Sequence, residues 1–445
     1  MSNWEEKYLS EVVDIRVSNV DKKLYPNKTL VKLCNYMDAY SNDYISNTIS
    51  YSIGSADANE IQRFGLRIND VIITKDSETP EDIAVSSVVI EELENVVCGY
   101  HLAILRPDKD KLDGTFLMLR LKSNDLKSYF LSVANGSTRF GLTIGNILNA
   151  KITFPSLSTQ IKIAIILSTA DAIIEKTQAT IAKYKAIKQG MLQDLFTRGI
   201  LTKDIKYKDK NGTWVERGRN QLRPSYQDAP ELYKESKLGW IPREWEDNQL
   251  SSFVEVINGG TPSTQIKEYW NGEIPWLSVD DFNNGERFVS TAYKKITQEG
   301  LKNSSTNILM PDMVIISARG TVGVISQLKI PMAFNQSCYG LNSINTNLQN
   351  DYLYYFLIYY KQYFGFTTYG SVFGTITRNY FDTMYIPMNL NSDEQKIIVG
   401  RLGIIDKKLQ TEQDFLHKQQ QIKAGLMNDL LSGRKKVSIK EKEIA

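Results

Sequence analysis

The stretch that decides the fold of this chain occurs twice. Residues 160–197 read QIKIAIILSTADAIIEKTQATIAKYKAIKQGMLQDLFT, and residues 395–432 read QKIIVGRLGIIDKKLQTEQDFLHKQQQIKAGLMNDLLS. They align without a gap at a constant offset of 235 residues, and 11 of the 38 aligned pairs are identical. This internal repeat predicts approximate two-fold symmetry within one polypeptide, with two like surfaces for two like partners. The identical pairs are Gln160/Gln395, Ile163/Ile398, Leu167/Leu402, Asp171/Asp406, Gln178/Gln413, Lys183/Lys418, Ile187/Ile422, Lys188/Lys423, Gly190/Gly425, Asp194/Asp429 and Leu195/Leu430.

Apolar residues recur in both stretches at steps of four and three, which is the spacing of one helix face. We expect each stretch to form one long helix. The simplest partner for each helix is the other copy, packed antiparallel as a coiled coil. The positions predicted to form this apolar seam are Ile163, Leu167, Ile174, Ile181, Ile398, Leu402, Leu409 and Leu416.

A different mixed segment precedes each helix, and we name residues 1–153 the first module and residues 245–388 the second module. The modules resemble each other weakly, and each ends in a Gly-Ser loop followed by a strand-like approach to a proline. Short β-branched runs, many Gly and Asn turns and a few helices predict an α+β fold for both. The matching positions, at an offset of 241, are Trp4/Trp245, Leu9/Leu250 and Val13/Val254.

The predicted order along the chain is module, helix, linker, module, helix and tail. Glycines and prolines punctuate the linker, which predicts an irregular segment with little core of its own. The charged tail is expected to fray. The predicted boundaries are 1–153, 154–198, 199–244, 245–388, 389–433 and 434–445.

Composition places the chain among folded soluble proteins. Hydrophobic residues make up 42% and charged residues 23% of the 445 residues. We find no run of about 18 apolar residues and no basic, apolar leader, so neither a membrane span nor a signal peptide is expected. Cys34, Cys98 and Cys338 are scattered and odd in number, which is typical of reduced thiols in the cytoplasm.

The charge is unevenly distributed. The modules are acidic, with net charges of −4 over residues 1–153 and −3 over residues 241–388. The helices and linker are basic, at +6 over residues 154–240 and +3 over residues 389–445. A basic module is the usual electrostatic footprint of a nucleic-acid binder, so charge alone does not indicate one here.

Motifs for most enzyme chemistries are absent from the sequence. It has no phosphate-binding G-x-x-x-x-G-K-[ST], no G-x-G-x-x-G and no Asn-Pro-Pro-Tyr or Asp-Pro-Pro-Tyr run of the amino-methyltransferases. Of the two histidines, His417 is expected to face solvent, and His101 lacks the further ligands of a zinc site. We therefore predict no metal site and no bound cofactor.

One nuclease pattern is present and stays open as an alternative. Pro107-Asp108 followed by Asp125 and Lys127 fits the loose spacing of a PD-(D/E)-x-K core, in which two carboxylates and a lysine hold Mg²⁺ and a water nucleophile. The same residues also fit an exposed turn after a strand. A protein-interaction scaffold that does not read DNA is a further alternative.

Polar loops at corresponding places in the modules are the candidates for binding. Arginine can bond guanine bidentately, Asn or Gln can do so with adenine, and Ser, Thr and glycine-loop N–H groups often hold phosphates. The candidate DNA-binding residues of the first module are Thr74, Lys75, Ser77, Gly136, Ser137, Thr138 and Arg139. Those of the second module are Ser317, Arg319, Gly320, Asn335, Gln336, Gly370, Ser371 and Arg378.

Taken with these features, the chain resembles the specificity subunits of Type I restriction-modification systems over essentially its whole length. The resemblance rests on the duplicated helix with its Gln…Asp…Lys-x-Gly…Asp-Leu pattern and on the Gly-Ser loops. The connector adds to it, with Phe196-Thr197-Arg198-Gly199-Ile200, Leu222-Arg223-Pro224-Ser225 and Glu235-Ser236-Lys237-Leu238-Gly239-Trp240-Ile241-Pro242. The second Gly-Ser loop departs from the family's Gly-Ser-Thr pattern at Val372, so no phosphate contact is assumed there.

This resemblance implies a subunit without catalytic activity. Each module would be a target recognition domain that reads one half of a bipartite double-stranded DNA site, and the paired helices would fix the spacing of the halves. Two adenine methyltransferase subunits, which carry S-adenosylmethionine, would dock on the chain, and restriction subunits could join them. The resemblance implies a cytoplasmic complex that defends its host against foreign DNA.

Overall fold

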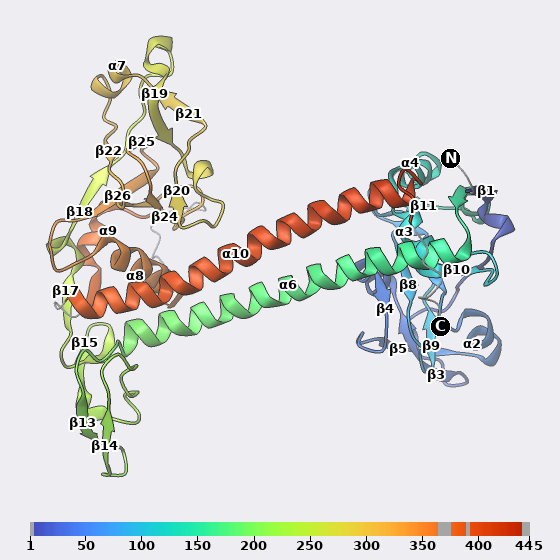
Figure 1. The fold of residues 1–445 in the computed structure, drawn as a ribbon, viewed down its shortest axis with the longest axis horizontal. Coiled ribbons are helices and arrows are strands. Elements are labelled where there is room, and N and C mark those ends of the chain that lie inside the picture. The colour runs from blue at the N-terminus through green and yellow to red at the C-terminus, as the bar shows by residue number, and fades with distance from the viewer. Residues whose placement is uncertain (1–3, 364–374, 389–391, 438–445) are drawn as a thin grey trace. The chain divides into compact units, whose positions relative to one another are not determined.

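The computed structural model describes residues 4–363, 375–388 and 392–437 (Figure 1). The chain divides into two compact units, Met1–Ala179 with Asp414–Ala445, and Thr180–Gln413. We name them unit 1 and unit 2. The division falls inside both long helices, so each unit contains one module and a part of each helix. The α+β fold with two modules and two long helices is as predicted, whereas the module and linker limits stay a prediction.

Unit 1 is built on a five-stranded sheet with the strand order β2-β10-β6-β8-β4. Strands β6 and β8 are fully buried, and β10 is buried except at Arg106, as expected for strands that are covered on both faces. Helix α3 covers the sheet and is itself almost entirely buried. The sheet strands are β2 (Val13–Val17), β4 (Tyr44–Ile45), β6 (Val71–Thr74), β8 (Ser86–Val89) and β10 (Leu102–Pro107). The helices are α1 (Tyr36–Ser41), α2 (Ala58–Phe64), α3 (Gly114–Leu121), α4 (Asn124–Val133) and α5 (Ile144–Leu148).

Smaller sheets complete the first module. Strands β3 (Thr29–Cys34), β5 (Ser52–Ala56) and β9 (Val96–Cys98) form a three-stranded sheet in the order β5-β3-β9. Strand β7 (Asp76–Ser77) pairs with β11 (Phe140–Gly141), and β1 (Glu5–Tyr8) pairs with β12 (Lys151–Phe154). The last pair joins the two ends of the module next to the long helix.

Unit 2 repeats this frame with different sequence. Its five-stranded sheet has the order β18-β26-β23-β24-β20, which matches unit 1 strand for strand. In both sheets the edge pair is parallel, β4 with β8 and β20 with β24, and the other pairs are antiparallel. The strands are β18 (Val254–Asn258), β20 (Phe288–Val289), β23 (Val314–Ser317), β24 (Ile325–Leu328) and β26 (Cys338–Ser343). Here too the ends pair, as β17 (Glu246–Gln249) with β27 (Tyr385–Met388).

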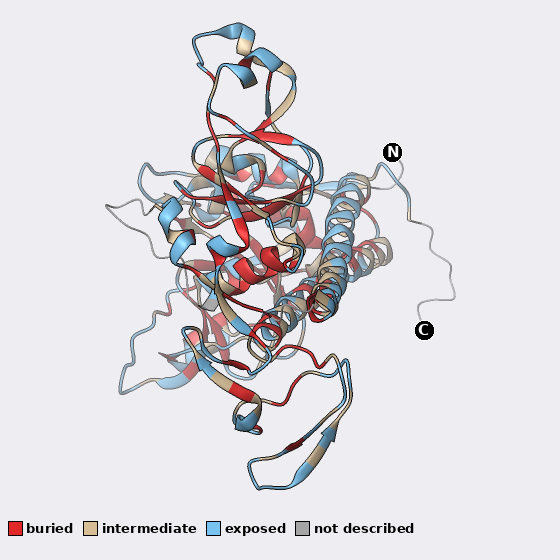
Figure 2. Cartoon of the chain, turned by 90° about the vertical axis from the view of Figure 1, so that its left-hand side faces the viewer, coloured by how far each residue is buried: buried red, intermediate tan, exposed pale blue. Residues whose placement is uncertain are grey.

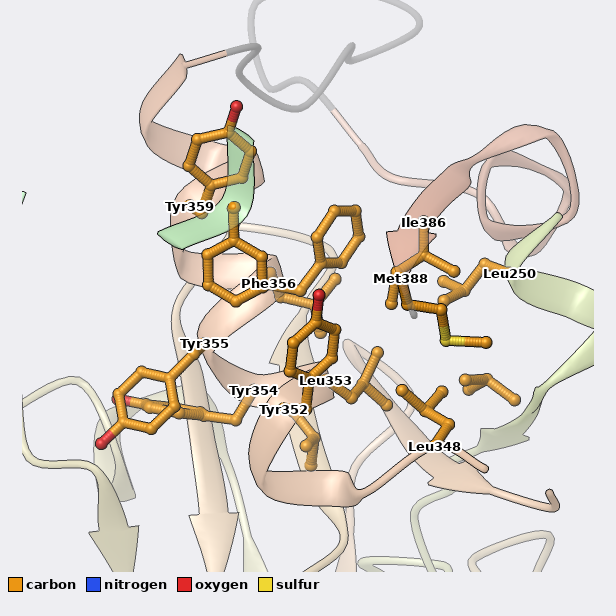
Figure 3. Packing of buried hydrophobic residues seen from close by; sticks show 14 of the residues in the cluster. Leu250, Leu348, Tyr352, Leu353, Tyr354, Tyr355, Phe356, Tyr359, Ile386 and Met388 are labelled. Carbon is orange, nitrogen blue, oxygen red and sulfur yellow. The ribbon is translucent and has the colours of Figure 1, made fainter. Parts of the chain in front are cut away.

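The side sheet of the second module is larger than that of the first. It has four strands in the order β21-β19-β25-β22. Their bounds are β19 (Trp270–Leu277), β21 (Lys294–Ile296), β22 (Ile308–Leu309) and β25 (Met332–Phe334). The helices are α7 (Gln298–Lys302), α8 (Asn350–Tyr363) and α9 (Arg378–Thr383). Aromatic side chains of α8, among them Tyr352 and Phe356, pack toward Leu250, Ile386 and Met388 in the core (Figure 3).

Two long helices follow the modules, α6 (Leu157–Thr197) and α10 (Ser392–Leu431), within about three residues of their predicted limits. They pair within each unit. As α6 runs forward from Asp171 in unit 1 to Lys188 in unit 2, its ion-pair partners on α10 run backward from Lys423 to Asp406, so the helices are antiparallel as predicted. Long stretches of both helices are exposed along one side (Figure 2).

The linker is more regular than its composition predicted. Strand β13 (Ile205–Lys208) pairs with β14 (Trp214–Arg217), and β15 (Tyr233–Ser236) pairs with β16 (Gly239–Pro242). Ile200, Tyr207 and Tyr233 are buried, so the linker packs as part of unit 2. The prediction of an irregular segment was wrong because the linker strands have only four residues, too few for an alternation such as that of Ile205-Lys206-Tyr207-Lys208 to be recognised among turn residues.

By length and composition, α6 is the one helix of the described residues that could cross a membrane. We expected no such stretch, because polar residues interrupt every apolar run of α6, but its many isoleucine, leucine and alanine residues keep the mean hydropathy high. In the described structure 28% of its most apolar window is buried. The start of α6 packs Ile163 and Leu167 into the core of the first module, and core helices of soluble proteins pass the same test of composition.

Candidate nucleic-acid interface

A hydroxyl group closes the loop at the end of each central strand. Thr74 Oγ1 donates to the carbonyl oxygen of Asp82 at 2.7 Å and accepts from the N–H of Val85 at 3.0 Å. In the second module Ser317 Oγ donates to the carbonyl oxygen of Thr321 at 2.5 Å and accepts from the N–H of Val324 at 2.8 Å. Thr74 and Ser317 are fully buried, so both support a loop rather than make the direct DNA contact predicted for them.

In the first module the fold brings two predicted segments together. Strand β7 pairs Ser77 with Phe140 of β11, which places Arg139 beside the 74–77 segment. The exposed loop contains Gly136, Ser137, Thr138 and Arg139, whereas Ser77 is buried. Lys75 is paired with the carboxylate of Asp76, which also lies 3.3 Å from Nδ1 of His101.

This loop pair borders a hollow of about 460 Å³ that contains aromatic, acidic and basic groups. Tyr36 and Tyr40 stack with ring centroids 5.5 Å apart on one face of α1. The Tyr40 hydroxyl donates to Asp82 at 3.0 Å, which raises the pKa of Tyr40 and keeps its proton in place. Such a site offers donors, acceptors and flat apolar surface to base edges. The hollow is lined by Tyr36, Met37, Tyr40, Asp76, Ser77, Glu78, Asp82, His101 and Arg139.

Three predicted segments also converge in the second module. The N–H groups of Ala318 and Arg319 donate to the carbonyl oxygen of Ser337 at 2.7 and 3.2 Å. The N–H of Ile376 donates to the carbonyl oxygen of Ala318 at 3.0 Å, which ties the start of α9 to the same place. The exposed predicted residues of this group are Arg319, Gly320, Gln336 and Arg378, and Asn335 is half-buried. Gly370 and Ser371 lie outside the described residues.

Sequence reasoning did not find Tyr36, Tyr40 and His101 in the first module, or Thr261 in the second. Thr261 Oγ1 hydrogen-bonds the side-chain oxygen of Gln336 and so joins the cluster of the second module from a distant loop. The pair Tyr36 and Tyr40, four residues apart, is a signal that could have been used, because two aromatic residues on one face of a short polar helix are a typical binding surface. Nothing in the sequence marks Thr261.

The family model described as the Type I restriction modification DNA specificity domain matches residues 1–184 and 242–424, most of the chain. The chain belongs to this family. It is therefore a Type I specificity subunit, as its sequence resemblance implied, and its modules correspond to two copies of the DNA specificity domain.

Individual relatives agree with this assignment. The HindI specificity subunit of Haemophilus influenzae is 22% identical over 377 residues, covering 77% of this chain and 79% of the relative. The MjaIX specificity subunit of Methanocaldococcus jannaschii is 31% identical over 174 residues, 37% of this chain and 39% of the relative. A crystal structure of the Type I S subunit from M. genitalium has the same fold, with a TM-score of 0.57, 15% identity and 96% of each chain covered.

The helix positions predicted for the specificity subunit are buried near the start of each helix, and all but one of the later positions are half-buried. Ile163 and Leu167 belong to the core of the first module, and Ile398 and Leu402 belong to that of the second. Farther along the helices only Ile181 is buried among the predicted positions. These half-buried positions are Ile174, Leu409 and Leu416.

The two carboxylates of the nuclease alternative are engaged in structural contacts. Asp108 pairs with Lys111 at 2.8 Å in a turn. Asp125 accepts two hydrogen bonds from the guanidinium of Arg120, at 2.8 and 2.7 Å, and that contact holds the pKa of Asp125 well below its usual range. Within the described part of the chain no group of three or more His, Cys, Asp or Glu side chains is arranged to hold a metal ion.

Proposed function

We propose that this specificity subunit reads a bipartite double-stranded DNA site without catalysing any reaction itself. The first module would read one half through the 136–139 loop and the adjacent hollow, and the second module the other half through the loops around Arg319, Gln336 and Arg378. The observation that carries the proposal is that the two modules have five-stranded sheets of equivalent strand order but different side chains in the loops. Two such modules are suited to two half-sites of different sequence.

The repeat helices are proposed to hold two adenine methyltransferase subunits. Four identical pairs lie at steps of four, three and four residues on one helix face, and most of these positions are exposed. Burial inside this chain does not explain their identity, whereas docking of two like partners does. These pairs are Lys183/Lys418, Ile187/Ile422, Gly190/Gly425 and Asp194/Asp429. S-adenosylmethionine would bind to the partners, restriction subunits could join them, and the complex would work in the cytoplasm.

Methylome sequencing tests DNA reading directly. A host that expresses this chain with its cognate methyltransferase subunit is expected to gain N6-methyladenine in a motif of two parts separated by a fixed gap. Replacing residues 1–153 with the first module of another family member should change one part only. A motif in which both parts change, or methylation that does not depend on the chain, would contradict the proposal.

A substitution on the exposed helix face tests the docking surface. Ile187 and Ile422 are 39% and 42% exposed, so Ile187→Asp with Ile422→Asp should leave the fold intact and weaken assembly with the methyltransferase at least about tenfold. Ala182 and His417 are exposed on a different helix face, five residues before Ile187 and Ile422, so Ala182→Asp with His417→Asp is the matched control. Equal loss of assembly in the control would contradict this surface.

A further inference from the structure

Each unit contains a half-buried three-residue contact between its module and the helix pair. In unit 1 the Tyr44 hydroxyl donates to Oδ2 of Asp171 at 3.0 Å, and the Nζ of Lys423 pairs with Oδ1 of the same carboxylate. One carboxylate of α6 thus holds both a side chain of the first module and a side chain of α10.

Unit 2 contains the same arrangement with the helices exchanged. The Tyr355 hydroxyl donates to Oδ2 of Asp406 at 2.7 Å, and Lys188 pairs with Oδ1 of that carboxylate. The carboxylate now comes from α10 and the lysine from α6. Asp171/Asp406 and Lys188/Lys423 are identical pairs of the repeat, so each repeat supplies the acid of one contact and the base of the other.

The two tyrosines come from unrelated elements. Tyr44 lies on β4, an edge strand of the sheet, whereas Tyr355 lies on α8, a helix that packs beside the sheet. The repeat therefore does not account for the tyrosines, because they have no common position in the two modules. A strand in one module and a helix in the other place a hydroxyl group against equivalent aspartates, which indicates that the contact itself is needed.

The surroundings strengthen both contacts. The side chains of Asp171 and Lys423 are 15% and 21% exposed, and those of Asp406 and Lys188 are 19% and 20% exposed, so solvent screens these pairs less than surface pairs. Burial, followed by the nearby aspartate, raises the pKa of Tyr44, so its hydroxyl remains a donor at physiological pH.

Charged neighbours extend each contact into the module. In unit 1 Asp43, next to Tyr44, pairs with Lys122. In unit 2 the guanidinium of Arg287 donates to the Tyr355 hydroxyl at 2.9 Å and also pairs with Asp351. The orientation of each module on its helices is therefore tied to directional bonds as well as to apolar packing, and apolar packing alone tolerates sliding.

We propose that Tyr44–Asp171–Lys423 and Tyr355–Asp406–Lys188 are positioning residues that set the angle of each recognition domain on the helix pair and thereby select the gap between half-sites. This inference rests on the proposed function, because the gap has meaning only if the two modules read one bipartite site. It assigns the choice of gap to six side chains in addition to the length of the helices.

The experiment measures methylation by the assembled complex on DNA duplexes that keep both half-sites and vary only the gap, from one base pair shorter to two longer than native. For Asp171→Asn, the ratio of the rate on the native gap to that on the altered gaps should fall by about tenfold. Tyr44→Phe should act in the same direction with a smaller change. The double variant Asp171→Lys with Lys423→Asp should recover much of the ratio that Asp171→Lys alone loses.

Glu60→Gln is the matched control, because it breaks the charged pair with Lys28 inside the first module, on α2, whose apolar cluster contains no residue of α6 or α10. It should lower thermal stability and leave the gap ratio unchanged. If Asp171→Asn instead lowers the rate equally on every gap, its role is merely structural and the inference is wrong. A wild-type complex that methylates no duplex of the series would contradict the proposed function itself, before any variant is compared.

Discussion

The two recognition domains have the same frame and differ in how they are anchored. Both have a five-stranded sheet of equivalent order and a strand pair that joins the module's ends. In unit 2 the start of α10 also holds a buried carboxylate, Glu394, which accepts from the N–H of Ile200 at 2.7 Å and from Nε1 of Trp245 at 3.0 Å. Arg223 of the linker lies 3.5 Å from the same carboxylate.

The corresponding position in unit 1 is Thr159, half-buried, whose hydroxyl lies 3.0 Å from that of Ser156. The difference follows from chain order, because the linker that leads into the second module has to be fixed to the helices of unit 2. The five-stranded sheet that both modules share presents the loops proposed to read DNA. The contacts at Glu394 and Thr159 differ because the chain enters the two modules differently. Each comparison below pairs a change in one unit with its counterpart in the other.

The largest expected effect is at the anchor of unit 2. Glu394→Ala leaves the N–H of Ile200 and Nε1 of Trp245 without their buried acceptor and removes one of the two carboxylates beside the buried Arg223, and should reduce the stability of unit 2 by about 3–5 kcal/mol. Thr159→Ala should cost unit 1 less than about 0.5 kcal/mol. Hydrogen exchange across a denaturant series reports the two units separately. Equal losses at the two positions would show that the anchors do not differ.

Substitution of the glycine after each long helix should also destabilise unit 2 more than unit 1. Gly199 and Gly433 both have positive φ, of 66° and 69°, and each lies against the tryptophan that begins a module. A Cβ on Gly199 would lie 2.2 Å from Oε1 of Glu394 and 2.4 Å from the Trp245 ring, whereas one on Gly433 would lie 3.0 Å from Trp4.

We expect Gly199→Ala to lower the free energy of unfolding by about 2–4 kcal/mol and Gly433→Ala by about 1 kcal/mol. Chemical denaturation of the two variants measures this difference. A larger loss from Gly433→Ala would mean that the environment of Trp245 relaxes more easily than its packing indicates.

Substitutions in the proposed DNA-reading loops of the two modules should each change a different part of the methylated motif. Arg139→Gln should relax one part of the methylated motif and Arg319→Gln the other, each by about 1–3 kcal/mol of discrimination if the arginine bonds a base bidentately. Arg16→Gln, on the edge strand β2 and paired with Asp14, is the control that should leave the motif unchanged. Methylome sequencing of the three variants compares them, and relaxation of both parts by one variant would contradict modular reading.

The smallest expected effect at neutral pH concerns the linker, which only unit 2 includes. Burial raises the pKa of Tyr233 from 10.0 to about 12, and its hydroxyl donates to the carbonyl oxygen of Pro224. The folded chain keeps this proton where the unfolded chain loses it, so the contribution is complete below pH 10 and is lost as pH rises toward 12.

Tyr233→Phe should cost about 1 kcal/mol at pH 7 and weaken the alkaline loss of stability in unit 2. Denaturation at pH 7, 10 and 11.5 tests this. A variant with the same alkaline profile as the wild type would assign that loss to other groups.

The sequence predicted those parts of the fold in which apolar residues recur at a regular spacing. The repeat predicted both helices and their antiparallel pairing, and its identical polar pairs, Asp171/Asp406 and Lys188/Lys423, proved to bond each other across the helices. No periodic pattern in the sequence indicates the contacts of Tyr44 and Tyr355 with those aspartates, because each contact joins elements that are far apart in the chain. The linker hairpins were not predicted because their strands have only four residues, too few for a periodic pattern to be recognised.

The candidate interface was predicted in outline and not in detail. Equivalent loops in the two modules could be found by their place after a buried strand, and the structure brings them together. Burial could not be foreseen residue by residue: Thr74 and Ser317 carry the hydroxyl groups expected of phosphate ligands, but both groups bond their own loop. Thr261 reaches Gln336 only through the tertiary fold.

The buried hydroxyls of Thr74 and Ser317 have a consequence for how such a protein diversifies. Each closes its loop at the stem, between the end of one strand and the start of the next, and neither bond involves a side chain at the tip. Mutations at the tip therefore change what the loop can recognise while the stem keeps its geometry and the sheet its register. New target sequences can accumulate at Arg319, or across the exposed tip that follows Ser77, at little thermodynamic cost to the domain that presents them.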